Sequence, residues 1–246
     1  MPFFILLLGP TGSGKSSILP YISKKLRLPQ KYSIQSIDTF VEANKTYKSK
    51  VNQFIFQKCH SKTLCDNLKK SLTNPSPQNF QYFENAYMDA RKKYEPLLDT
   101  KLVQSIRNNE NIIVESTGLS FPYWMISMIP NHYEIYFVYS VVEFCELIMR
   151  NKTRALKQMI KYVRDPESPA PRLPKFEEKD FKTKLEIILK NLASIMKKES
   201  PIEKQFRLIV VENHGKLRFL FDSYKDWQNV DRSVRNIEKI YNIRKC

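Results

Sequence analysis

The chain has 246 residues, of which 42% are hydrophobic, and a formal net charge of +16 at pH 7. A chain of this length can form one complete α/β domain with a buried core. Its N-terminal apolar run is too short for a secretory signal, and no stretch approaches the ~18 apolar residues of a membrane span. We therefore expect an intracellular, cytoplasmic protein without a membrane partner.

The positive charge bears on the partners of the protein. A strongly basic chain attracts polyanions such as nucleic acid or acidic cosubstrates. Lysines in such numbers are equally typical of solvated helix faces, so charge alone leaves both interpretations open.

The four cysteines are scattered and include no C-x-x-C pair. This pattern favours reduced thiols over a disulfide framework or a zinc site. Cys59-His60 with Cys65 is interpreted as part of a helix face rather than as a metal site.

Residues 9–16, with the sequence GPTGSGKS, fit the phosphate-binding pattern G-x-x-x-x-G-K-[ST]. Context decides the value of so short a pattern, because it also arises by chance. Residues 3–8 are wholly apolar, as in a strand buried on both faces. Apolar residues then recur at helical spacing from residue 18 to residue 26, before Pro29. This order of strand, glycine loop and helix is the one that a P-loop (Walker A motif) requires.

The chemistry of the loop residues predicts their roles. Glycines allow backbone conformations in which successive N–H groups converge on an anion at a helix N-terminus. Lys15 is predicted to reach the β- and γ-phosphates of ATP, and the Ser16 hydroxyl to bind Mg²⁺. The alternative is a glycine turn with an incidental Lys-Ser pair. The predicted nucleotide-binding residues are Gly9, Pro10, Thr11, Gly12, Ser13, Gly14, Lys15, Ser16 and Ser17.

Further apolar runs predict strands at residues 32–37, 111–114, 133–139, 206–211 and 216–221, the last two as a hairpin. Together with the first strand, they predict an α/β P-loop NTPase fold with a mostly parallel, doubly wound sheet and helices on both faces. Ligands of such sheets bind outside the carboxyl ends of the strands, so polar residues at those ends are candidates. They are Asp38 after the second strand, and Glu115 and Thr117 after the third.

The predicted organisation is a single domain over residues 1–246. A helical insertion occupies about residues 40–110, with breaks at residues 74–77 and at Pro96. An arginine-bearing lid and its hinge occupy about residues 150–175, and a C-terminal hairpin and helix about residues 206–246. Aromatic residues from Phe80 to Tyr94 are either core residues or a platform that stacks on a substrate base.

Two classes of P-loop protein are disfavoured. A GTPase carries N-K-x-D, but the Asn-Lys pairs at residues 44–45 and 151–152 are not followed by the aspartate. A motor or helicase ATPase has a strand that ends in Asp-Glu, whereas the strand before Glu115 ends in a single acid. A kinase needs instead a base for the acceptor hydroxyl and cations for the phosphoryl group in transfer.

Asp38 is the candidate base, with a helix N-cap as its alternative role. The candidate cations lie on a predicted amphipathic helix at about residues 142–163, which carries a basic stripe, and in the proline-broken segment 165–174 behind it. An arginine delivered by such a lid can raise the rate by ~10³–10⁵. A solvated helix face is the alternative. The candidates, in no fixed order, are Arg150, Arg154, Arg164 and Arg172.

The glycine loop, the sequence Asp38-Thr39-Phe40, the sequence Glu115-Ser116-Thr117 and the arginine-bearing lid together resemble the zeta-toxin type of P-loop kinases. The chain is also similar to the related 5′-hydroxyl polynucleotide kinases. The resemblance covers roughly residues 1–165. It implies that Asp38 is the general base, that Glu115 and Thr117 line the acceptor pocket, and that lid arginines grip the phosphates. Val41, Glu42 and Ala43 stand where the zeta-toxin pattern has a basic residue and a His-Pro, which leaves the acceptor open.

We therefore expect an ATP- and Mg²⁺-dependent phosphotransferase that acts on a hydroxyl of a nucleotide-sugar or nucleotide-like acceptor. One alternative is a 5′-hydroxyl polynucleotide kinase that acts on nucleic acid. Another is a non-catalytic nucleotide switch or adaptor, which would bind partners through the lysine-rich insertion, residues 171–174 or the basic residues Lys239, Arg244 and Lys245.

Overall fold

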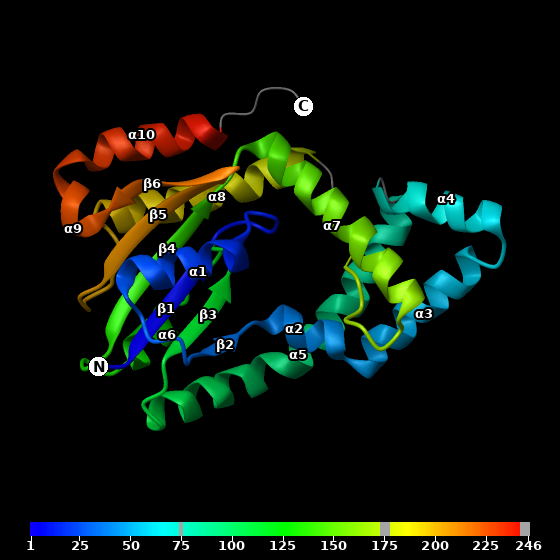
Figure 1. Cartoon of the computed structure of the whole chain (residues 1–246), viewed down its shortest axis with the longest axis horizontal. Coiled ribbons are helices and arrows are strands. Elements are labelled where there is room, and N and C mark those ends of the chain that lie inside the picture. Colours follow the sequence, from blue (N-terminus) through cyan, green and yellow to red (C-terminus); the bar gives the residue numbers. More distant parts are fainter. Residues whose placement is uncertain (74–75, 173–177, 242–246) are drawn as a thin grey trace. The chain divides into compact units, whose positions relative to one another are not determined.

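The computed structural model describes residues 1–73, 76–172 and 178–241 (Figure 1). Its contacts group the chain into two compact units. The sheet unit comprises Met1–Gln35, Lys101–Leu147 and Lys179–Cys246, and the helical unit comprises Ser36–Thr100 and Ile148–Glu178. The predicted single domain stays a prediction. The helical unit contains most of the predicted insertion and lid.

The sheet unit is built on a six-stranded sheet in the order β2-β3-β1-β4-β5-β6. All neighbouring strands are parallel except β5 and β6, which form the predicted antiparallel hairpin around Gly215. The mostly parallel α/β sheet is therefore confirmed. The strands are β1 (Phe3–Leu8), β2 (Ser33–Gln35), β3 (Ile112–Ser116), β4 (Glu134–Val141), β5 (Arg207–His214) and β6 (Lys216–Asp222).

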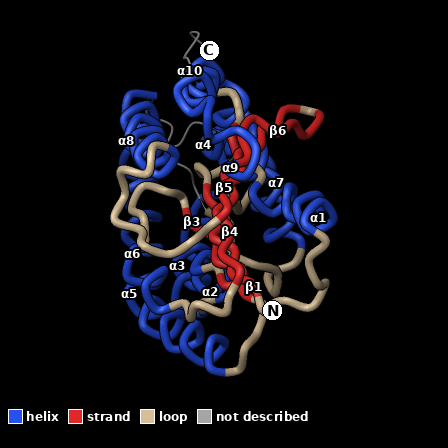
Figure 2. The backbone as a smooth tube through the Cα atoms, turned by 90° about the vertical axis from the view of Figure 1, so that its left-hand side faces the viewer, coloured by secondary structure: helices blue, strands red, loops and turns tan. Residues whose placement is uncertain are grey.

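Helices lie on both sides of this sheet, with α1 on one side and α6 and α8 on the other (Figure 2). Strand β1 is apolar throughout because it is buried on both faces. Its residues Phe3, Ile5 and Leu7 pack in one core cluster with Ile18 and Ile22 of α1. The helices of the unit are α1 (Lys15–Leu26), α6 (Tyr123–Met128), α8 (Glu178–Met196), α9 (Ser223–Asp226), the 3₁₀ helix η1 (Trp227–Asn229) and α10 (Val230–Tyr241).

The register of the sheet brings the polar strand ends together. Leu7 pairs with Glu115, and Leu8 pairs with both Ser116 and Tyr139. The carboxyl ends of β1, β3 and β4 therefore share one edge, where the glycine loop leaves β1.

The helical unit contains α2 (Ile37–Ala43), α3 (Lys45–Lys58) and α4 (Lys62–Thr73), with parts of α5 (Pro77–Arg107) and α7 (Phe144–Arg164). Its core includes Val41, Tyr47, Phe54, Phe83 and Tyr162. Within the aromatic-rich stretch, Phe83 is a core residue and Tyr87 packs against the core, whereas Tyr82 is exposed.

The predicted break at Pro96 is wrong, because α5 continues through it. A proline removes one donor from a helix, but the remaining bonds and the packing can hold a long helix together. The hydroxyl of Thr100 donates to the Pro96 carbonyl, at 2.9 Å. Of the break predicted at residues 74–77, residues 74–75 lie outside the described residues, and α4 and α5 end and begin on either side.

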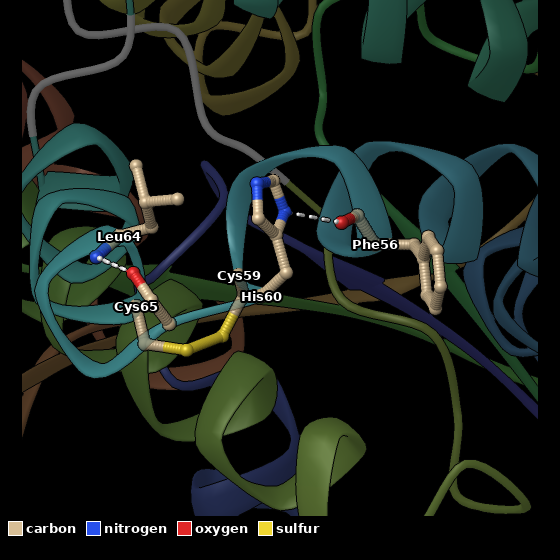
Figure 3. Close-up of a disulfide and its surroundings, with 6 residues drawn as sticks. Phe56, Cys59, His60, Leu64 and Cys65 are labelled. Carbon is tan, nitrogen blue, oxygen red and sulfur yellow. Dashed lines mark hydrogen bonds between the residues drawn. A yellow bond between two sulfur atoms is a disulfide. The ribbon is translucent and has the colours of Figure 1, made fainter.

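The prediction of reduced thiols is wrong at Cys59 and Cys65, which form a disulfide (Figure 3). It is also wrong at Cys145, which is disulfide-bonded. Residues 59–61 connect α3 to α4 so tightly that the two Cα atoms lie 4.4 Å apart. His60 contacts the Phe56 carbonyl through Nδ1, at 3.2 Å (Figure 3). Among the described residues no cluster of three potential metal ligands is found. Cys246, Arg244, Lys245, Leu173 and Pro174 lie outside the described residues.

In the described part of the chain, no helix combines the length and the apolar composition that crossing a membrane requires.

Candidate functional site

The loop between β1 and α1 has the backbone of an anion cradle. Gly9, Gly12 and Gly14 have φ angles of 143°, 88° and 76°, which side-chain-bearing residues rarely adopt. Gly14 is the N-cap of α1, and the first turn of the helix carries no acidic residue. The N–H groups of a first helical turn lack intrahelical partners and carry a partial positive charge. The positive N-terminal end of α1 is therefore not neutralised by an acidic side chain of its first turn and can attract a phosphate group.

Lys15 is folded over the loop. Its ammonium group donates to the carbonyl of Gly9, at 2.8 Å, and to that of Pro10, at 3.4 Å. The ammonium group is thereby held beside the backbone that would surround a phosphate.

Ser16 and Glu115 are brought together by the sheet register. The Ser16 hydroxyl donates to Glu115 Oε1, at 3.1 Å. A hydroxyl and a carboxylate are the oxygen ligands that Mg²⁺ prefers. The donor set therefore fits the metal ion predicted for Ser16, and Glu115 lies beside that residue. Thr117 lies in the turn after β3, where its hydroxyl accepts from the Leu119 N–H, at 3.4 Å.

Two residues that the sequence did not single out as site residues hold the loop in place. The hydroxyl of Ser140, at the end of β4, donates to the Ser13 carbonyl, at 2.7 Å. The amide of Asn213, near the end of β5, donates to the same carbonyl, at 2.9 Å. The middle of the loop is thus fixed from two neighbouring strands.

Replacing Gly9 with alanine is expected to destabilise the loop. A Cβ atom there would lie 2.7 Å from both Ser13 Oγ and the Ser140 carbonyl oxygen. Such overpacking costs about 1–3 kcal/mol, so the free energy of unfolding and the affinity for ATP should both fall. Chemical denaturation and ATP titration measure the two effects.

Gly215→Ala is the matched control for this variant. Gly215 also has a positive φ, of 67°, but a Cβ atom there meets nothing within 4 Å. Its substitution should cost about 1–2 kcal/mol of backbone strain and leave ATP affinity unchanged. Equal loss of ATP affinity in both variants would contradict the role of Gly9 in the cradle.

A second cluster lies in the helical unit, around Asp38. Ser36 is the N-cap of α2, so Asp38 lies in the first turn and the N-cap alternative for it is wrong. Glu42 follows one turn later and on the same face. Arg172 Nη1 lies 2.7 Å from Asp38 Oδ1, and Arg172 Nε lies 2.9 Å from Glu42 Oε1. The Tyr87 hydroxyl donates to Asp38 Oδ1 as well.

The segment that carries Arg172 is fixed to α2 and α3. The Ala170 N–H donates to the Glu42 carbonyl, at 2.8 Å, and the Tyr47 hydroxyl donates to the Pro171 carbonyl, at 2.9 Å. Lys48 donates to the carbonyl of Glu167, at 3.0 Å. These bonds hold the predicted hinge, up to Arg172, against α3 and against α2, the helix of the candidate base.

Burial and charge shift the ionisation of this cluster. Burial raises the pKa of Glu42, Arg172 counteracts the rise, and Asp38 adds to it. Burial also raises the pKa of Tyr87, with the negative charge of Asp38 as a further cause. Burial by itself lowers the pKa of Arg172, but the charges of its neighbours, Asp38 first, hold it above its usual value. Arg172 is therefore a permanent cation here.

The other predicted lid arginines differ in position. Arg154 of α7 is partly buried, and burial, together with the like charge of Arg172, lowers its pKa. Its charge acts on Glu42 as well, so Arg154 belongs to the Asp38 cluster. Arg164 is exposed and lines a hollow with Cys59 and Cys65, while Arg150 is partly buried.

Glu42 and Tyr87 are members of the cluster that the sequence did not identify. Glu42 carried a usable signal, because a residue four positions after Asp38 on a helix shares its face. Tyr87 carried none, since it was one of several aromatic residues in the stretch interpreted as core or stacking platform.

No protein-family model matches the chain, and no curated protein sequence matches it. A similar solved structure comes from the PezAT chromosomal toxin–antitoxin system of the human pathogen Streptococcus pneumoniae, with a TM-score of 0.57 and 14% sequence identity. The match covers 100% of this chain and 80% of that one. A presumed kinase from Chloroflexus aurantiacus has a TM-score of 0.39 and 12% identity, over 97% of this chain and 94% of that one. The first likeness shows a shared α/β fold.

Proposed function

We propose that the chain is an ATP- and Mg²⁺-dependent phosphotransferase that moves the γ-phosphate of ATP to a hydroxyl of a nucleotide-sugar or nucleotide-like acceptor. The observation that carries this proposal is the glycine cradle at the N-terminus of α1, with Lys15 folded over it and Ser16 beside Glu115. This combination of backbone donors, a cation and oxygen ligands fits a nucleotide triphosphate with its metal ion.

The proposed residues have separate tasks. Lys15 and the loop amides bind the phosphates, and Ser16 binds the metal ion with Glu115 next to it. Bound Mg²⁺ neutralises charge on the phosphates. Asp38 accepts the proton of the acceptor hydroxyl, and the oxygen of that hydroxyl forms the new bond to the γ-phosphorus. The bond between the γ-phosphorus and the bridging oxygen breaks, and ADP leaves with its electrons. Arg172 and Arg154 balance the negative charge of the group in transfer.

Two further observations support the zeta-toxin-like form of this activity. The sequence Asp38-Thr39-Phe40 lies after β2, and the sequence Glu115-Ser116-Thr117 forms the end of β3 and the residue after it. The fold is shared with a chain from a toxin–antitoxin system. Of the proposed acceptors, a nucleotide sugar follows from the resemblance to zeta-toxin kinases.

The direct test is transfer of label from γ-labelled ATP with Mg²⁺ to three parallel acceptor panels, namely nucleotide sugars, nucleosides and 5′-hydroxyl oligonucleotides. We expect label on one class of acceptor, and the proposal names nucleotide sugars as that class. Nucleotide binding without label on any panel would favour the switch or adaptor alternative over the kinase.

Salt dependence separates the two kinase alternatives, since the net charge of +16 also suits a nucleic-acid acceptor. A nucleotide sugar should lose only a few-fold in affinity between 50 and 200 mM salt, because it carries few charges. A nucleic-acid end bound through 6–10 phosphate contacts should lose about 10³–10⁵-fold over the same range. The apparent affinity for the acceptor, measured at both salt concentrations, distinguishes the two alternatives. If this affinity does not depend on salt, the polynucleotide kinase is ruled out.

A further inference from the structure

Tyr87 of α5 contacts the Asp38 carboxylate and the residues next to it. Its hydroxyl donates to Asp38 Oδ1 and accepts from Arg172 Nη1, at 3.3 Å. The Arg172 guanidinium carbon lies 5.3 Å from the centre of its ring. Tyr47, which is 1% exposed, meets the same ring edge-on with a centroid distance of 6.1 Å. The ring is thereby held in the orientation that aims its hydroxyl at Asp38.

The Tyr87 hydroxyl stays a donor under working conditions. Burial raises its pKa, and the adjacent carboxylate of Asp38 raises it further. A phenol in this state does not ionise near neutral pH and presents its proton to Asp38 throughout.

Arg172 also donates to Asp38 Oδ1, at 2.7 Å, but it is shared with other groups. It is also paired with Glu42, at 2.9 Å, and it is a candidate for binding the transferring phosphate. An arginine that turns towards a phosphate weakens its bond to Asp38. Among the described residues, the Tyr87 hydroxyl bonds to Asp38 and Arg172 and to no second carboxylate, so it would keep Asp38 in place during that step.

We propose that Tyr87 is a positioning residue for the reaction, and that its hydroxyl orients the Asp38 carboxylate and holds it in its ionised, proton-accepting form. This inference rests on the proposed function, in which Asp38 is the general base. A hydrogen bond to a carboxylate favours the ionised form and so lowers the pKa of the acid. Removing the hydroxyl of Tyr87 should therefore raise the pKa of Asp38.

Other charges around Asp38 act on the same equilibrium. Arg172 and Arg154 favour the ionised form, as does the more distant Arg91 of α5, whereas Glu42 on the same helix opposes it. None of these groups changes in Tyr87→Phe, so a shift in that variant reports the lost hydroxyl.

The test compares Tyr87→Phe with Tyr82→Phe, a matched variant in the same helix. The Tyr82 hydroxyl bonds to the Lys50 carbonyl, at 3.4 Å, and to Gln53, at 3.3 Å, which are groups outside the Asp38 cluster. In Tyr87→Phe the acidic limb of the kcat profile should move up by about one pH unit, the size that one lost charge-assisted hydrogen bond gives. Tyr82→Phe should keep the wild-type profile.

A second readout needs no transfer activity. Carboxyl-carbon NMR of the full chain without nucleotide follows the titration of Asp38, whose signal is assigned by its loss in Asp38→Asn. The inference is supported if the pKa of Asp38 rises in Tyr87→Phe but not in Tyr82→Phe. It is overturned if the pKa of Asp38 in Tyr87→Phe equals that of the wild type. If no acceptor is phosphorylated, the proposed function fails, while the NMR titration still decides whether Tyr87 controls Asp38.

Discussion

Replacing Lys15 with alanine is expected to lower phosphate transfer by about 10³-fold, the loss typical when one preorganised group that faces developing charge is removed. The ammonium group is already held over the loop, 2.8 Å from the Gly9 carbonyl, so it needs little rearrangement to meet a phosphate. ATP affinity should fall as well, because in the proposed function the same cation binds the phosphates of ATP. Initial rates with γ-labelled ATP and titration with ATP measure the two losses.

Lys24→Ala is the control for this variant. Lys24 lies in the same helix, α1, but near its C-terminal end and exposed to solvent. The Lys24→Ala substitution removes the same charge from the chain without changing the loop, so transfer activity should stay within a factor of two of the wild type. If Lys15→Ala behaved like Lys24→Ala, the loop would be a glycine turn rather than a nucleotide site.

The structure of the glycine loop could be predicted from the sequence because its signals are local. An apolar run, three glycines and a Lys-Ser pair follow one another within residues 3–16, and the structure gives them the strand, positive φ angles and helix start that the motif requires. Ser140 and Asn213 could not be found in this way. Ser140 donates to the Ser13 carbonyl from 127 residues away along the chain, and Asn213 donates to the carbonyls of Ser13 and Gly14 from 200 and 199 residues away.

The Asp38 cluster was predicted in part. Asp38 and Arg172 were both candidates, but their direct ion pair was not expected, because it depends on how residues 166–172 attach to α2 and α3. That attachment uses backbone groups of Ala170 and Pro171, which leave no pattern in the sequence. The disulfide of Cys59 and Cys65 was missed for a similar reason, since only the tight connection between α3 and α4 brings the two Cα atoms to 4.4 Å.

Replacing Asp38 with asparagine is expected to lower kcat by about 10²–10⁴-fold, the range for loss of a general base. Asparagine keeps the shape and one carbonyl oxygen, but it does not accept the proton of the acceptor hydroxyl. Affinity for ATP should change little, because the proposed phosphate contacts come from residues 9–17 and not from Asp38. Parallel measurements of ATP binding and label transfer separate the two effects.

Folding should survive this substitution. Arg172 keeps Glu42 as an ionic partner, at 2.9 Å, so the partly buried guanidinium is not left without a counter-charge. Asp89→Asn is the matched control, since Asp89 also pairs with a cation, Lys50, at 3.5 Å, but at the surface. Loss of such an exposed pair costs at most about 1 kcal/mol and should leave kcat unchanged.

The comparison assigns Asp38 either to chemistry or to structure. A fall in kcat with an unchanged thermal midpoint and unchanged ATP affinity identifies Asp38 as the base of the reaction. If Asp38→Asn kept full transfer activity, the Asp38–Arg172 pair would serve to fasten residues 166–172 to α2, and the base would have to be another group. Because Glu42 shares Arg172 and lies one turn away, Glu42→Gln would then be the variant to test for lost proton transfer.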